Sequence, residues 1–161
     1  MKYHSSALIV FIFLSFTVFA GCQEKKQEPQ DSLRLRPGVE IKNTDDGEVR
    51  IQYYDKGQTR SETLYKNGKR NGYHRLYNED DILLSEGTFT DGKMEGEFKS
   101  FYPDGSIKIL AHYKHGLLDG ESLTYNLNGQ VIIKDIYKKN KIIKTIRYKP
   151  NGEIEYEETF E

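Results

Sequence analysis

The chain has 161 residues, enough for one ordinary domain or one short array of repeats. It carries 24 basic and 25 acidic side chains, a formal net charge of −1, so it lacks the cationic bias typical of proteins that bind nucleic acid. Its one cysteine excludes an intramolecular disulfide, and stability therefore has to come from sheet pairing and side-chain packing.

The N-terminal segment is organised like an export signal. Lys2 gives a positive start, residues 7–20 are mostly apolar, and small residues lead to Cys22. The apolar run suits a signal peptide and is short for a membrane span, which needs about 20 residues. The sequence Phe-Ala-Gly-Cys at 19–22 resembles the lipobox of bacterial lipoproteins, where leucine is usual at the first position. The resemblance implies a signal peptide over 1–21 and acylation of the Cys22 thiol. The alternative is a plain secretory signal followed by an unrelated cysteine.

Residues 22–46 are predicted to be the lipidated cysteine and a flexible tether. The stretch is polar and charged, and it ends in an Asn-Thr-Asp-Asp run at 43–46. Low hydrophobicity combined with high charge disfavours ordered structure. Leu33, Leu35, Val39 and Ile41 alternate with other residues, so a short strand before the repeats is an open alternative.

A period of 24 residues organises positions 47–161, and glycines at 72, 96 and 120 mark it. Each unit carries one aromatic five residues after its start and a second one seventeen residues after its start. The first set is Tyr53, Tyr77, Phe101 and Tyr125, and the second set is Tyr65, Phe89, Tyr113 and Tyr137. Aromatics make up 12% of the chain, so this regularity indicates true repeats.

Each unit also contains two turn signals. One centres on Gly57, Asp81, Gly105 and Gly129 in successive units. The other is expected to be longer and bounded by glycines, as at 67–72 and 91–96. Glycine accepts the positive φ that tight turns need. The segments between turns are rich in β-branched and aromatic residues and lack helical spacing, so we predict an all-β array of ten strands, a ribbon roughly 45 Å long.

Two segments carry a family resemblance. Tyr-Lys-Asn-Gly-Lys-Arg-Asn-Gly at 65–72 and Phe-Thr-Asp-Gly-Lys-Met-Glu-Gly at 89–96 resemble the MORN repeat, in particular the bacterial variant found in the YwqK-type antitoxin family. The resemblance extends over roughly 48–161. It implies an elongated single-layer antiparallel sheet of about five β-hairpin repeats, contact with other proteins and, for some members, neutralisation of a toxin.

Two surfaces are candidate binding sites. The eight repeated aromatics are expected to share one face, where they would bind a ligand or only pack against each other. The second candidate is a basic patch: Lys138, Lys139, Lys141 and Lys144. It would dock on an anionic partner, or it would pair with the glutamates at 153–161 on the last strand.

No residue pattern in the sequence indicates catalysis. His112 and His115 flank Tyr113, but successive side chains of a strand alternate in direction, so the two histidines would point to opposite faces. We therefore expect solvent-facing histidines, no metal site, no cofactor and no enzyme activity. The expected function is that of an envelope lipoprotein, in the outer rather than the inner membrane, which binds an unidentified protein and no nucleic acid. The alternatives are an antitoxin or immunity protein, a structural spacer, and a protein that binds an envelope polymer.

Overall fold

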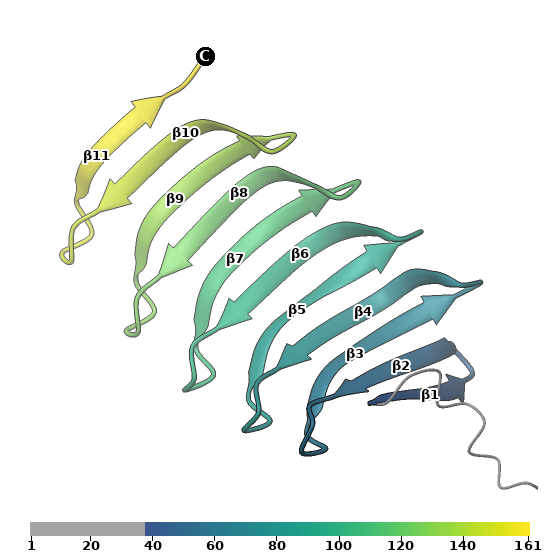
Figure 1. The fold of residues 1–161 in the computed structure, drawn as a ribbon. Helices are drawn as coiled ribbons and strands as arrows, with labels where there is room; N and C mark the ends of the chain where they lie inside the picture. The colour runs from purple at the N-terminus through teal and green to yellow at the C-terminus, as the bar shows by residue number, and fades with distance from the viewer. Residues whose placement is uncertain (1–37) are drawn as a thin grey trace, which may run out of the picture.

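The computed structural model describes residues 38–161, which form one open antiparallel sheet of eleven strands. Each strand pairs with its neighbours in the chain, and the sheet is a single curved layer (Figure 1). The strands are β1 (Val39–Thr44), β2 (Gly47–Tyr53), β3 (Thr59–Lys66), β4 (Lys69–Tyr77), β5 (Leu83–Thr90), β6 (Lys93–Phe101), β7 (Ile107–Lys114), β8 (Leu117–Tyr125), β9 (Val131–Lys138), β10 (Lys141–Tyr148) and β11 (Ile154–Thr159). The predicted all-β hairpin array is confirmed.

Little of the described chain is buried, because a single layer has no second sheet to pack against. Its buried hydrophobic side chains are Val49, Ile51, Leu64, Ala111 and Ile146. The first three form one small cluster near the N-terminal end of the sheet, against which Tyr53 and Tyr73 pack. No helix in residues 38–161 is long and apolar enough to cross a membrane.

The sheet begins earlier than residue 47, where the sequence predicted the array to start. Residues 39–44 form β1, which pairs with β2 from Val39↔Gln52 to Thr44↔Gly47. The predicted tether boundary at residue 46 is thus corrected, and the array has eleven strands instead of ten. The polar run at 43–46 closes this first hairpin, because the residue types that disfavour a core also favour tight turns. Residues 22–37 and the predicted signal peptide lie outside the described part of the chain.

The second turn of each unit is shorter than the sequence predicted. Lys66 pairs directly with Lys69, so only Asn67 and Gly68 make the turn, and both have positive φ (51° and 74°). Two-residue turns of this kind match the right-handed twist of the flanking strands. The equivalent turns are Asp91-Gly92, His115-Gly116 and Lys139-Asn140, all with positive φ at both residues.

The glycines that mark the period lie inside strands and not in turns. Each of them is directly opposite a second-set aromatic: Gly72↔Phe89, Gly96↔Tyr113 and Gly120↔Tyr137. A methyl group added at Gly72, Gly96 or Gly120 would lie nearest to Leu64, Thr88 or His112, respectively. These glycines also have positive φ, 120°, 81° and 117°, at irregularities of the strand pairing.

The first-set aromatics are stabilised by a different pairing. Most of them lie opposite an aliphatic residue across the hairpin, as in Tyr77↔Leu83, Phe101↔Ile107 and Tyr125↔Val131. Aromatic–aliphatic pairs across antiparallel strands each contribute about 0.2–1 kcal/mol relative to an alanine pair. Adjacent units are also joined by hydrogen bonds to main-chain carbonyl oxygens.

The hydrogen bonds between adjacent units repeat along both long edges of the sheet. Gly92 N donates to Arg70 O and Gly116 N donates to Met94 O, each at 2.8 Å. On the other edge, the Tyr54 hydroxyl donates to Tyr77 O at 2.8 Å. Every unit is therefore held mainly by its neighbours, as in other solenoid-like arrays.

Gly72→Ala is expected to destabilise the sheet more than Gly96→Ala. Both glycines have positive φ, but a methyl group on Gly72 would lie 2.5 Å from Cδ2 of Leu64, while one on Gly96 would lie 3.6 Å from Thr88 Oγ1. Backbone strain costs both variants about 1–3 kcal/mol, and overpacking adds about 1–3 kcal/mol for Gly72→Ala alone. Urea unfolding measures the difference. Equal loss in both variants would contradict the steric account.

Candidate functional site

The eight repeated aromatics are divided between the two faces of the sheet. Ile51 pairs with Glu62 across the β2–β3 hairpin, so these two side chains share a face. Tyr53 is two residues from Ile51 and keeps that face, whereas Tyr65 is three residues from Glu62 and takes the other. The same parity holds in the later hairpins, which corrects the expectation of a single aromatic face.

The two faces are named after their aromatic rows. The first-row face carries Tyr53, Tyr77, Phe101 and Tyr125. The second-row face carries Tyr65, Phe89, Tyr113 and Tyr137. The first row lies beside the first turns and the second row beside the second turns, so they run along opposite long edges of the sheet.

Carboxylates and hydroxyls surround the first row. The Tyr53 hydroxyl donates to Glu40 on β1, and this hydrogen bond raises the pKa of Tyr53 to about 12 and lowers the pKa of Glu40. The Tyr77 hydroxyl donates to Glu62 at 3.4 Å, and burial followed by the Glu62 charge raises the pKa of Tyr77. The first row is therefore engaged in interactions within the sheet.

Glutamates repeat at one phase on the first-row face. Glu62 and Glu86 are both opposite Arg75, and the Arg75 Nε atom is 3.6 Å from a Glu86 oxygen. Glu86 is also opposite Lys99 on β6. Charges of alternating sign thus stand side by side on successive strands, which supports a role in strand pairing for these glutamates.

The second row alternates with long side chains from the even-numbered strands. Pairing across the second turns places Arg70, Met94, Leu118 and Ile142 beside Tyr65, Phe89, Tyr113 and Tyr137. All four aromatics are half-buried. The row is thus a partly accessible stripe, cationic at its N-terminal end and apolar beyond it.

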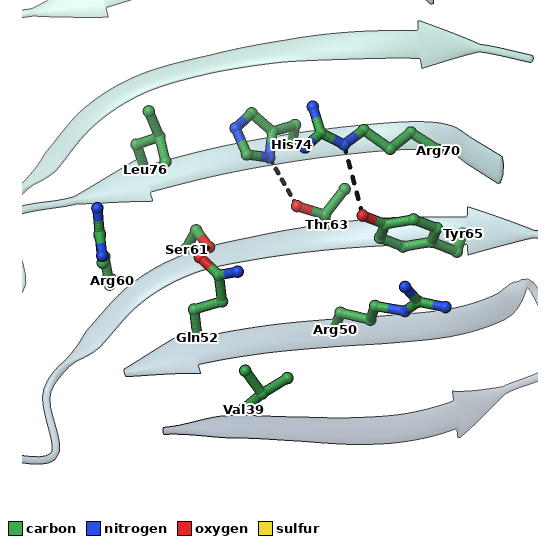
Figure 2. Close-up of a pocket in the computed structure, with 10 residues that line it drawn as sticks. All are labelled: Val39, Arg50, Gln52, Arg60, Ser61, Thr63, Tyr65, Arg70, His74 and Leu76. Carbon is green, nitrogen blue, oxygen red and sulfur yellow. Dashed lines mark hydrogen bonds between the residues drawn. The ribbon is translucent and has the colours of Figure 1, made fainter. Parts of the chain in front are cut away.

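A depression of about 610 Å³ opens on the second-row face over strands β1–β4 (Figure 2). Its lining residues are Val39, Arg50, Gln52, Arg60, Ser61, Thr63, Tyr65, Arg70, His74 and Leu76. The floor is polar and internally bonded. Ser61 donates to Gln52 Oε1 at 3.2 Å, and Thr63 Oγ1 is 2.7 Å from His74 Nδ1.

The arginines of this depression have different partners. Arg50 Nε is 2.5 Å from Glu48 Oε1, and its guanidinium lies 4.0 Å from the centre of the Tyr65 ring. Arg70 donates to the Tyr65 hydroxyl at 3.4 Å and lies 5.3 Å from the Phe89 ring centre. The Arg60 guanidinium lies 5.9 Å from the centre of the Tyr54 ring. Among residues 38–161, no carboxylate lies within 4 Å of the Arg60 or Arg70 side-chain nitrogens.

Burial favours the neutral form of His74. Burial lowers its pKa below the usual value, and the positive charge of Arg70 lowers that pKa further. The ring contacts Phe89 edge to face, with a centroid distance of 5.7 Å. This depression could not be predicted from the sequence, because Arg50, Arg60 and Arg70 are far apart in the chain and none occupies a position that defines the repeat.

The basic patch lies at the opposite end of the sheet, on the end of β9, the following turn and β10. Lys144 Nζ is 2.6 Å from Glu157 Oε1 on β11, and Lys141 donates to the Glu161 carbonyl. Every residue of β11 is exposed. Pairing of the basic strand with the acidic last strand, which the sequence left open, is thus present. Docking of Lys138, Lys139, Lys141 and Lys144 on an anionic partner stays a prediction.

The remaining sequence candidates are dispersed. His112 Nε2 is 3.9 Å from Glu97, and His115 Nδ1 is 3.5 Å from Glu95. Within the described residues, no group of three His, Cys, Asp or Glu side chains could hold a metal ion. Cys22 lies outside the described part of the chain.

Comparisons with known proteins agree with the repeat structure. Residues 49–67, 94–115 and 118–139 match the family model of the MORN repeat variant. No match was found among the curated proteins. The MORN resemblance predicted from the sequence is thus confirmed at these three segments, while the YwqK-type assignment stays a prediction.

Some solved structures share a similar arrangement over part of their length. The crystal structure of TarM is 15% identical with a TM-score of 0.43, over 68% of this chain and 22% of that chain. The crystal structure of the GtfA/B complex bound to UDP and GlcNAc is 12% identical with a TM-score of 0.33, over 78% of this chain and 24% of that chain. This chain therefore spans about a quarter or less of those proteins.

Replacing Arg70 by Gln is expected to raise the pKa of His74, because it removes a positive charge that disfavours the imidazolium. The folded chain takes up this proton less readily than the unfolded chain. The stability linked to His74 is therefore present above the unfolded pKa of about 6.5 and lost as the pH falls. NMR titration of the His74 ring measures the shift. Arg75→Gln, on the other face, is the control. An unchanged pKa in Arg70→Gln would contradict the assignment.

Proposed function

We propose that this protein is a membrane-anchored envelope lipoprotein whose repeat array binds another protein through its second-row face. The observation that carries the proposal is the row of half-buried aromatics and aliphatics along that face, which no other segment of residues 38–161 covers. Met94, Leu118 and Ile142 continue the row, and Ile142 is 37% exposed. When a partner covers this stripe, its exposed apolar area is removed from water, which favours binding.

The row has the composition of a protein interface. Tyrosine, phenylalanine, methionine and arginine are enriched at the centres of such interfaces, and all four occur here. The aromatic rings are held by neighbours: Tyr113, for example, packs edge to face against Phe98 with a centroid distance of 6.0 Å. A preorganised ring loses little conformational freedom on binding, which favours affinity.

The first-row face is a weaker candidate for the same role. Its central positions carry paired charges, such as Arg75 with Glu86, and the hydroxyls of Tyr53 and Tyr77 donate to glutamates. Covering these groups with a partner would require their desolvation, which reduces the net gain. The open, extended shape and the paired carboxylates support binding in preference to catalysis.

Anchoring rests on the N-terminal sequence. The segment before Cys22 is apolar, begins with Lys2 and ends in the lipobox-like tetrapeptide. Stable anchoring requires more than one acyl chain, and the lipoprotein resemblance implies several on Cys22. The array would then be held near a membrane surface, with its faces available to proteins there.

A photoactivatable amino acid at position 113 is expected to crosslink one specific protein in cells, and the same probe at position 112 is not. These neighbouring positions point to opposite faces, and position 113 is in the second row. Mass spectrometry identifies the captured protein. Equal capture of abundant envelope proteins from both positions would contradict the proposal.

The captured protein then provides a quantitative test. Tyr113→Ala should weaken its binding by tenfold or more, as truncation of a central aromatic does at protein interfaces. Tyr125→Ala, in the first row, removes a comparable half-buried ring and serves as the matched control. If the captured protein is a toxin, the antitoxin alternative gains support within the same proposal.

Cys22→Ala is expected to abolish incorporation of an alkyne-labelled fatty acid and to move the protein out of the membrane fraction. The thiol is the group that the lipobox resemblance assigns to acylation. Metabolic labelling followed by fractionation measures both effects. Label that persists in Cys22→Ala, or an unmodified wild-type protein in the soluble envelope fraction, would contradict anchoring.

A further inference from the structure

The second-row face changes character at its N-terminal end. The position beside the second aromatic is Met94 on β6, Leu118 on β8 and Ile142 on β10, but it is Arg70 on β4. The preceding strands add Arg50 and Arg60 around the same depression. An apolar stripe thus ends in a cluster of guanidinium groups.

We infer that this depression is a recognition site for a carboxylate-bearing polypeptide segment. The inference rests on the proposed function, because it assigns an acidic stretch to the part of a partner that lies over β1–β4. The row beyond the depression would contact the apolar part of the same partner. The depression, at about 610 Å³, falls within the range of ligand sites, roughly 300–1,000 Å³.

The charge balance favours an anion. Glu48 offsets Arg50 at 2.5 Å, and this leaves Arg60 and Arg70 without a carboxylate within 4 Å among the described residues. His74 contributes no positive charge in its neutral form, and the other lining side chains are uncharged. The depression therefore carries two guanidinium charges that a bound anion would offset. The fork of an arginine side chain matches the planar geometry of a carboxylate.

The shape favours a polypeptide over a membrane surface. Ser61 and Thr63 form the floor and are only 4% and 6% exposed, so the surroundings rise above them. A flat bilayer would contact the rim, whereas a single side chain can enter. The Tyr65 ring, flanked by Arg50 and hydrogen-bonded to Arg70, provides one wall with both apolar and polar contact (Figure 2).

The test uses the full chain in detergent micelles and fluorescein-labelled hexaglutamate as the probe, with hexalysine, inorganic phosphate and phosphatidylglycerol vesicles at equal ionic strength. Saturable binding of hexaglutamate is expected by fluorescence anisotropy. Arg70→Gln and Arg60→Gln should each weaken it on the order of tenfold, as the loss of one charged hydrogen-bond donor does. Arg70→Lys, which keeps the charge but not the fork, should fall between the wild type and Arg70→Gln.

Arg147→Gln is the matched control, since Arg147 is an exposed cation at the other end of the same face, opposite Ile133. It should leave hexaglutamate binding unchanged. A second measurement is the pKa of His74, which bound hexaglutamate should raise by offsetting the Arg70 charge. A purely structural role for the arginines would not produce that shift.

Two outcomes would overturn the inference. One is equal weakening by Arg147→Gln and Arg70→Gln, which would indicate nonspecific attraction. The other is binding of phosphate or vesicles without binding of hexaglutamate. The proposed function is tested separately by capture from position 113. If the chain does not bind hexaglutamate and the Arg70→Gln variant still captures the partner from position 113, the carboxylate site alone is refuted. If the chain binds hexaglutamate but captures no partner from position 113, the protein-binding row alone is refuted.

Discussion

The constraint on which the sheet depends is the left-handed backbone of a glycine that lies opposite a second-row aromatic of the neighbouring strand. Phe89, Tyr113 and Tyr137 each have this partner, and the spacing of those glycines is the period of the chain. Each of these glycines has a left-handed backbone that any other residue would strain, and a methyl group at Gly72 would also collide with Leu64. This requirement is met once per unit, at the irregularity of the strand pairing beside each second turn.

The absence of a covering layer follows from the same arrangement. Because each ring is stabilised within its own sheet, the described array stands with few fully buried residues. Its stability is then a sum of local terms between adjacent units rather than the property of one core. The single layer also leaves the second row half-accessible, so the residues that hold the sheet together are also those available to a partner. Structure and recognition therefore cannot be separated by mutating the row alone, which is why the first row provides the matched control.

The sequence predicted ten of the eleven strands and the centres of the turns, because turn chemistry and strand composition are local properties. It missed β1 and made the second turns too long. It did not predict which face each aromatic takes. Tyr53 pairs with Thr59, and an unbroken register from there would put Tyr65 on the same face as Tyr53. A β-bulge adds one residue, Arg60, to β3. The side chains that follow it, including Tyr65, therefore point to the opposite face from the one that an unbroken register would give them. The bulge is not marked by any residue type that separates it from ordinary strand sequence. The cationic depression was also missed, since its arginines come from three strands and meet only after the sheet has formed.

The acidic last strand has a consequence for how copies of this protein behave together. An open sheet ends in a strand whose outer backbone groups are unpaired, and such an edge invites another sheet to join it. On β11 the glutamates at 155, 157 and 158 surround that edge. Two copies that met along β11 would bring like charges into register, which opposes that pairing. We therefore expect the acidic last strand to disfavour a dimer joined edge to edge through β11.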